Sequence, residues 1–179
     1  ADPSTVGDAL GILDFYGIDI SDDLRELLES RVLETPKPGD PVFARVHTVV
    51  IGSNEHVVRA AAAEARRLRY RPLPLTTFLE GEAREAARVL VSVARSVQDA
   101  RIPIAPPACL IAGGETTVTV RGPGTGGRCQ EFTLAAARSI RGKTGVLVAA
   151  FGTDGTDGPT DAAGAIADGR TIDRALQAG

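Results

Sequence analysis

In the first 43 residues, apolar side chains recur every three or four positions in two short stretches, which is the pattern of amphipathic helices. The pair Ser4-Thr5 can cap the first helix and Gly17 can end it, while Ser21 can cap the second. The three prolines of residues 35–41 then exclude helix and central strand, because proline has no amide hydrogen to donate. Residues 1–43 are therefore predicted to be a helical lead-in or linker.

From residue 44 on, the pattern alternates between strand and helix. A β-branched run at 46–51 and a stretch at 73–77 with flanking prolines are expected to be strands, the second at a sheet edge. Helices are expected after each of them, the first through about Leu68 and the second after Gly81. This alternation predicts an α/β fold, a layered sheet with flanking helices and mostly parallel strands, over residues 44–106.

The last part, residues 107–179, continues the alternation but is much richer in glycine, with fourteen of the 20 glycines lying after residue 112. Strands are expected at 108–112, 116–121 and 146–151, and helices at about 128–140 and from about 171. Glycine loops separate these elements, so we expect backbone conformation to matter more than side chains there. We interpret this part as a second α/β region.

Composition narrows the class of protein. With 43% hydrophobic and 24% charged residues in 179, the chain can build a folded core. A net charge of −3 argues against nucleic acid as the main partner, and the longest apolar runs are too short to cross a bilayer. These features predict a cytoplasmic protein without membrane or nucleic-acid partners. The lack of methionine, even at position 1, leads us to expect a piece of a longer protein.

Candidate chemistry lies where predicted strands end, because open α/β sheets bind ligands there. The first candidate is Gly52-Ser53-Asn54, which precedes a helix. Its backbone amides could bind an anion, but the same residues could be an ordinary helix cap. The two histidines, His47 and His56, have no nucleophile pattern near them and are expected to be structural or exposed.

The second candidate is the glycine loop that ends in Gly126, Gly127 and Arg128. Glycines before a helix let amides approach an anion, while a cation such as Arg128 opposes the positive end of the helix dipole. An external carboxylate or phosphate would relieve that conflict. Alternatively, Glu131 one turn later could be the partner of the arginine. The loop has neither a Walker pattern nor a convincing dinucleotide fingerprint.

The third candidate is the loop after the strand at 146–151, which carries Asp154, Asp157 and Asp161 among glycines. Carboxylates with this spacing could hold Mg²⁺, or one could be a general base. They could also simply form turns, as Asp-Gly pairs readily do. Glu115, after Gly113-Gly114, could face the same cleft or lie exposed at a β-bulge.

These motifs resemble the MOFRL region of glycerate 2-kinases, a family often named as hydroxypyruvate reductases of tartrate degradation. The resemblance rests on AGGETTVTV at 112–120, GGRCQE at 126–131 and above all GTDGTDGPTDAAG at 152–164. Earlier segments, DPST at 2–5, GSN at 52–54 and GEA at 81–83, are similar to the middle region of that family in the same order. One departure is Cys129, where the family usually has asparagine.

The resemblance implies phosphorylation of D-glycerate at the 2-hydroxyl to 2-phosphoglycerate, with ATP and Mg²⁺, in a cleft between two α/β domains. It implies further an amino-terminal domain with a catalytic lysine, which is missing here and would be the partner of this chain. Arg128 matches the active-site arginine of the family. The remaining candidates follow as substrate or phosphate ligands (Glu115, Gly126, Gly127, Ser53 and Asn54) and as metal ligands (Asp154 and Asp157).

Two other readings stay open. One is an NAD(P)H-dependent hydroxypyruvate reductase, as relatives are often named, and the other is a non-catalytic α/β binding module. A homodimer is also left open. The loss of the usual asparagine at Cys129 would affect activity only if that side chain contacts a ligand.

Overall fold

A computed structural model describes residues 2–178 of the chain. The chain divides into two compact units, Ala1–Val50 and Ile51–Gly179. In the first, helices α1 (Val6–Phe15) and α2 (Asp22–Glu29) confirm the two predicted helices, and a short 3-10 helix, η1 (Pro41–Arg45), follows. Thr5 caps α1, accepting a hydrogen bond from the amide of Asp8, and Ser21 caps α2.

The strand expected at 46–51 is not present. The side chains of this run are exposed, Ile51 to 95%. β-branched residues favour an extended backbone, but a strand also needs a neighbouring strand for its hydrogen bonds. Within residues 2–178 no strand pairs with this run.

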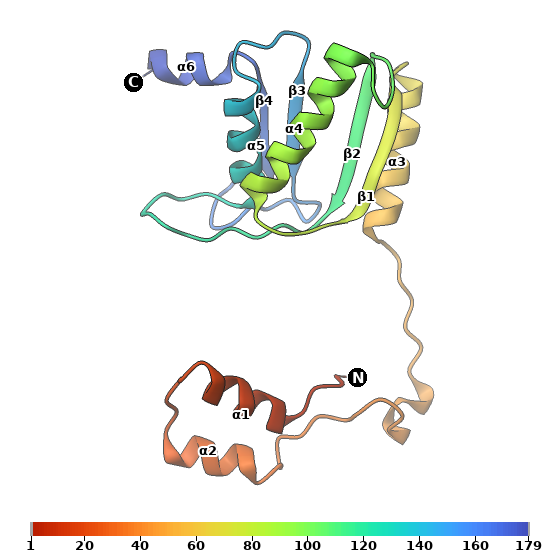
Figure 1. Cartoon of the computed structure of the whole chain (residues 1–179). Helices are drawn as coiled ribbons and strands as arrows, with labels where there is room; N and C mark the ends of the chain where they lie inside the picture. Colours follow the sequence, from red (N-terminus) through yellow and green to blue (C-terminus); the bar gives the residue numbers. More distant parts are fainter. Residues whose placement is uncertain (1, 179) are drawn as a thin grey trace. The chain divides into compact units, whose positions relative to one another are not determined.

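The second unit contains eight elements, and Figure 1 shows their arrangement. They are α3 (Asn54–Arg67), β1 (Arg71–Leu79), α4 (Ala83–Ala100), β2 (Ala108–Gly114), α5 (Arg128–Ser139), β3 (Leu147–Phe151), β4 (Gly164–Asp168) and α6 (Thr171–Ala178). β1 and β2 pair in parallel, with Arg71 opposite Ala108. β3 and β4 pair antiparallel, with Leu147 opposite Asp168. The predicted α/β class is thus confirmed, although one of the two strand pairs is antiparallel.

Two strand predictions in the last part need correction. Residues 116–121 form no strand, and only Thr117 makes an isolated bridge, to Glu82. The strand β4 was not expected from the sequence, because Gly-Ala-Ile-Ala-Asp carries a single β-branched residue. It forms because β3 offers a full hydrogen-bonding edge to it.

The core of the second unit lies between α4 and α5. Four residues of these helices and their ends are buried together: Ala87, Val91, Ala136 and Ile140. Phe132 and the β3-side residues Val146 and Val148 pack against this cluster. Alanines at the contact let the two helices approach closely, and α3 covers β1 and β2 through its own buried stripe of Val58, Ala62 and Ala65.

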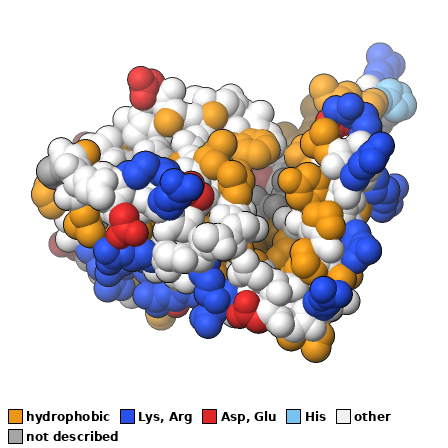
Figure 2. Space-filling view, turned by 90° about the horizontal axis from the view of Figure 1, so that it is seen from above, with side chains coloured by type: hydrophobic (Ala, Val, Ile, Leu, Met, Phe, Trp, Pro, Cys, Tyr) orange, Lys and Arg blue, Asp and Glu red, His pale blue; other side chains and the backbone are white. Residues whose placement is uncertain are grey.

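All the candidate loops lie at one end of this unit. β1, β2 and β3 run toward that end, and α3, α4 and α5 begin there (Figure 1). The opposite end, where α3 and α4 finish, is seen from above in Figure 2 and shows many lysine and arginine side chains. None of the helices in residues 2–178 has the length and hydrophobicity of a membrane-spanning segment.

Candidate functional site

Arg128 and Glu115 are brought together by the fold. Arg128 is the first residue of α5, and Glu115 directly follows β2. Nη1 of Arg128 lies 2.7 Å from Oε1 of Glu115, and both side chains are well exposed, at 45% and 73%. The guanidinium is therefore held by one carboxylate contact while much of its surface faces solvent. An arginine in this state can exchange or add an anionic partner at low cost.

Glu131, the other acid that the sequence offered to Arg128, has a different partner. Its Oε1 lies 2.8 Å from Nη2 of Arg84, at the start of α4. This ion pair ties the beginnings of α4 and α5 together. Arg128 is consequently left with Glu115, a residue on a different loop.

Asp157 takes a role that the sequence did not indicate. Its side chain is buried, and its two oxygens accept hydrogen bonds from the backbone amides of Cys129 and Gln130, at 2.9 and 2.8 Å. Burial alone would raise the pKa of Asp157, but these hydrogen bonds outweigh it and hold the pKa below its usual range. Asp157 thus caps α5 from a distant loop, a structural role that the sequence did not indicate, and its role as a magnesium ligand stays a prediction.

This cap changes the expected anion site at the start of α5. Gly127 is the N-cap residue and has no side chain to satisfy the helix amides, so Asp157 supplies the carboxylate. The amides of the second and third helical residues are therefore occupied from within the protein. Within residues 2–178 the amides of Gly127 and Arg128 donate no hydrogen bond, which makes these two the candidates for contact with an anion.

At the start of α3, Ser53 forms the ordinary cap that the sequence left open. Its hydroxyl accepts a hydrogen bond from the amide of His56 at 3.4 Å and lies 3.1 Å from Nδ1 of the same residue. Nδ2 of Asn54 donates to the carbonyl of Thr77, near the end of β1. Asn54 also lies close to Gly113, so this helix start sits beside the ends of both parallel strands.

Asp154 and Asp161 lie exposed on the loop between β3 and β4. Oδ1 of Asp154 accepts a hydrogen bond from the amide of Thr156 at 3.2 Å, which is the local turn that Asp-Gly sequences favour. Among residues 2–178, no three His, Cys, Asp or Glu side chains are placed to hold a metal together. Asp154 stays a prediction as a single carboxylate ligand.

Glu82 lies at this end too, in the GEA segment at 81–83, but was not predicted as a site residue. It precedes α4, and its carboxylate accepts hydrogen bonds from the hydroxyl and the amide of Thr119. These bonds hold the pKa of Glu82 below its usual range. The same rule that found Glu115, a carboxylate at the end of a strand, would have found Glu82 after β1.

Cys129 contributes its amide rather than its thiol to the site. Burial, together with the nearby charge of Asp157, raises the pKa of the Cys129 thiol, which therefore stays protonated near neutral pH. His47 and His56 are both exposed, as expected, and Nδ1 of His56 lies 3.1 Å from the Ser53 hydroxyl that caps α3.

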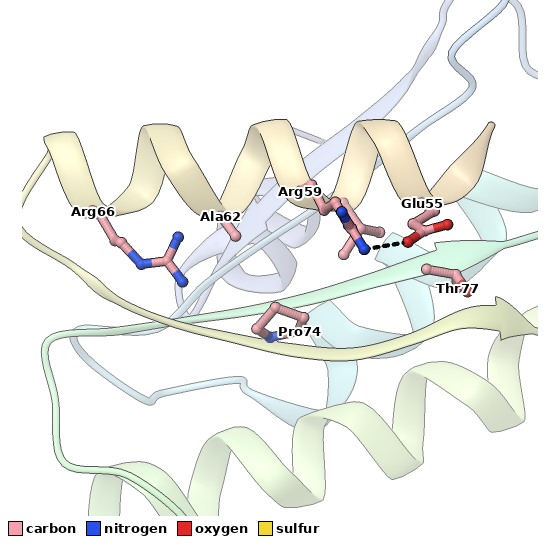
Figure 3. A pocket seen from close by; sticks show the side chains of 7 residues that line it. Glu55, Arg59, Ala62, Arg66, Pro74 and Thr77 are labelled. Carbon is pink, nitrogen blue, oxygen red and sulfur yellow. Dashed lines mark ion pairs between the residues drawn. The ribbon is translucent and has the colours of Figure 1, made fainter. Parts of the chain in front are cut away.

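A shallow groove of about 340 Å³ runs along α3 beside β1 (Figure 3). Val58, Ala62 and Pro74 form its apolar part, and Arg59 pairs there with Glu55 at 2.5 Å. None of the predicted site residues lines this groove. The predicted site residues therefore lie at the loops at the strand ends, around Arg128, and not in this groove.

Comparison with known proteins gives a family match and several similar proteins. Residues 108–179 match the MOFRL family. The chain is 43% identical to D-glycerate 2-kinase of Thermotoga maritima over 170 residues, which are 95% of this chain and 39% of the relative. It is 41% identical over 181 residues to an Agrobacterium vitis protein that carries a hydroxypyruvate reductase name, covering 100% of this chain and 40% of the relative.

The comparison of folds also finds a protein from Thermotoga maritima. The crystal structure of glycerate kinase from Thermotoga maritima matches 98% of this chain and 41% of its own chain, with a TM-score of 0.76 and 41% identity. The resemblance deduced from the motifs is thereby confirmed. The chain spans about two fifths of the length of the relatives it matches.

Proposed function

We propose that this chain is part of an ATP-dependent kinase. The premise is that residues 108–179 match the MOFRL family and that the chain resembles glycerate 2-kinases almost throughout. The reaction is phosphorylation of D-glycerate at its 2-hydroxyl, giving 2-phosphoglycerate. The observation that carries the proposal is Arg128, a half-exposed arginine at the start of α5, at the end where β1, β2 and β3 finish.

Arg128 is the residue that contacts an anionic group of the reactants. Phosphoryl transfer depends mainly on positioning and on neutralising the charge of the transferring group, and a guanidinium does both. Arg128 would clamp the glycerate carboxylate or the transferring phosphoryl group, with the free amides of Gly127 and Arg128 beside it. Glu115 cannot favour an anion by its own charge, so its place in the site is to orient the guanidinium at 2.7 Å.

Ser53 and Asn54 have a more restricted part in this proposal. The hydroxyl of Ser53 already caps α3, and Asn54 is anchored to the carbonyl of Thr77. What they can offer a phosphate is therefore the positive end of α3 and its first amides. Gly126 supports the site differently, because it has no side chain and leaves open space for a phosphate beside its backbone.

Of the two predicted magnesium ligands, Asp154 has the freer carboxylate. Both oxygens of Asp157 are used by α5, whereas Asp154 is exposed and keeps one oxygen free of hydrogen bonds within residues 2–178. Mg²⁺ in phosphoryl-transfer sites takes one or two carboxylates and completes its shell with phosphates and water. Asp154 would hold the ion, which when bound offsets the negative charge of the ATP phosphates.

The partner of this chain is the remainder of the same protein. The relatives are about 2.5 times as long as this chain, so residues outside it have room to form a second domain. We expect ATP to be held mainly there, together with the catalytic lysine that the family resemblance implies. We expect the enzyme to act in the cytoplasm.

A hydroxypyruvate reductase is the second candidate, supported by the names of two relatives. The glycine loop before Arg128 has the spacing G-x-G-x-x-G at 122–127, but among the described residues no strand leads directly into it, as the dinucleotide fingerprint of such an enzyme requires. The two functions separate cleanly in an assay, because only a reductase oxidises NAD(P)H in the presence of hydroxypyruvate.

The test is turnover by the complete protein that contains this chain. We expect D-glycerate to stimulate ADP release, with phosphate on the 2-hydroxyl by ³¹P NMR, and Arg128→Ala to lower kcat/KM by at least about 100-fold. Arg121→Ala is the matched control, since Arg121 lies exposed on the same loop. Absence of glycerate-dependent turnover, with nucleotide or glycerate still bound, would instead indicate a non-catalytic binding module. Equal effects of the two substitutions would remove Arg128 from the site.

A further inference from the structure

Asp157 joins the two most distinctive motifs of the chain. It belongs to the loop between β3 and β4, yet its carboxylate holds the first turn of α5, which lies 28 residues earlier. Only 1% of the residue is exposed, so the charge has been removed from water and depends on the amides of Cys129 and Gln130 for compensation. A buried carboxylate with both oxygens used in this way fixes the geometry between the two segments closely.

The contact does not rest on the carboxylate alone. Nε2 of Gln130 donates to the backbone carbonyl of Asp157 at 3.3 Å and to the hydroxyl of Thr160 at 3.0 Å. The Thr160 hydroxyl in turn donates to the carbonyl of Asp157 at 2.8 Å. Side chain and backbone of Asp157 are therefore both tied to the first turn of α5.

Two glycines let the segments come this close. A Cβ atom on Gly127 would lie 2.3 Å from Cγ of Asp157, well inside van der Waals contact. Gly158 adopts a φ of +62°, and a Cβ there would lie 2.3 Å from the carbonyl oxygen of Gly126. The backbone at residues 126–127 is thus in direct contact with residues 157–158. This contact fixes the position at which α5 begins.

We propose that Asp157 is the positioning residue of Arg128. By holding the amides of Cys129 and Gln130, it fixes where α5 begins, and Arg128 is the residue immediately before them. The place of the Arg128 Cα determines whether the guanidinium reaches both Glu115 and a bound anion. This inference rests on the proposed function of Arg128, and it assigns to Asp157 an effect on catalysis that is transmitted through the helix start.

The test uses the complete enzyme and the substitution Asp157→Asn, which keeps the shape but removes the charge and one acceptor. We expect kcat to fall about 10- to 100-fold, as for a small misplacement of a reacting group, with the KM for ATP unchanged. Asp99→Asn is the matched control, an exposed carboxylate near the end of α4 and away from the candidate loops (Figure 1), and we expect it to leave kcat unchanged. Circular dichroism at the assay temperature confirms that each variant is folded.

A second measurement separates positioning from general loss of structure. In an Arg128→Lys background, Asp157→Asn should lower kcat by less than about threefold, because a flexible lysine depends less on where its Cα lies than a planar guanidinium does. An equal loss in both backgrounds would overturn the proposal. So would an Asp157→Asn enzyme with wild-type kcat, whereas an inactive wild-type enzyme would overturn the proposed function instead.

If Asp157→Asn does not fold, Thr160→Val carries the same test in milder form. It removes the hydroxyl bound to the carbonyl of Asp157 and leaves the carboxylate in place. We expect kcat to fall about two- to fivefold with an unchanged KM for ATP and a smaller effect in the Arg128→Lys background. Equal effects of Thr160→Val in both backgrounds would overturn the proposal.

Discussion

The guanidinium of Arg128 and the carboxylate of Glu115 lie 2.7 Å apart although the residues are separated by 13 positions and lie on different elements. Exposed ion pairs of this kind contribute only about 0–1 kcal/mol to the free energy of unfolding. The pair is therefore poorly explained as a stabilising contact. Its position at the end of β2 and the start of α5 fits an orienting contact for a group that binds substrate.

Glu115→Gln should accordingly affect activity more than stability. We expect the free energy of unfolding to change by less than about 0.5 kcal/mol, and kcat/KM for D-glycerate to fall about tenfold because the guanidinium loses its anchor. Steady-state kinetics and urea unfolding measure the two quantities. Glu85→Gln is the matched control, since Glu85 forms an equally close exposed pair with Arg88 on α4. Similar kinetics for both variants would contradict the orienting role.

The contact between the glycine loop and the aspartate loop predicts a sharp difference between adjacent glycines. In Gly127→Ala the new methyl group would lie 2.3 Å from Cγ of Asp157, whereas in Gly126→Ala nothing lies within 4 Å. We expect Gly127→Ala to lower the free energy of unfolding by about 1–3 kcal/mol, as for an overpacked site, and Gly126→Ala by less than about 0.5 kcal/mol. Urea denaturation measures the free energy of unfolding of both variants. Equal losses of that free energy would show that the two loops can move apart to make room for the methyl group.

The sequence predicted the helices and most strands because their periodicity is local. It also placed Arg128 and Glu115 among the candidates at strand ends and helix starts, which meet at one edge of an α/β sheet, but it offered Glu131 and not Glu115 as the partner of Arg128. It could not predict the bond from Asp157 to Cys129 and Gln130, because the bond depends on the path of two glycine loops. The β-branched runs at 46–51 and 116–121 indicated strands, because local sequence does not show whether a neighbouring strand is present. Within residues 2–178 neither run has a full partner strand.

Ile140 is expected to be the most sensitive apolar residue near α5. It is fully buried against Ala87, Val91 and Ala136, whereas Leu134 on the same helix is 54% exposed. Ile140→Ala should lower the free energy of unfolding by about 2–4 kcal/mol, because it removes buried methyl groups and leaves a cavity. Leu134→Ala should cost less than about 1 kcal/mol by the same measurement. A similar cost for both would mean that the contact between α4 and α5 is not the core of the unit.

Asp168 predicts a pH dependence at the start of α6. Hydrogen bonds from the Arg174 side chain, the amide of Arg170 and the hydroxyl of Thr171 lower the pKa of Asp168 to about 2. In an unfolded chain the pKa of an aspartate is about 3.9, so the folded state binds the proton more weakly. The stabilisation by Asp168 is therefore complete above about pH 5 and is lost as the pH falls through 4 toward 2.

Urea unfolding of the wild type and of Asp168→Asn, followed between pH 7 and pH 2, measures this contribution. We expect the difference in free energy to be constant at neutral pH and to shrink toward zero near pH 2, because protonation removes in the wild type the charge that the substitution removes in the variant. A difference that stays constant down to pH 2 would mean that Asp168 acts through its shape and not through its charge.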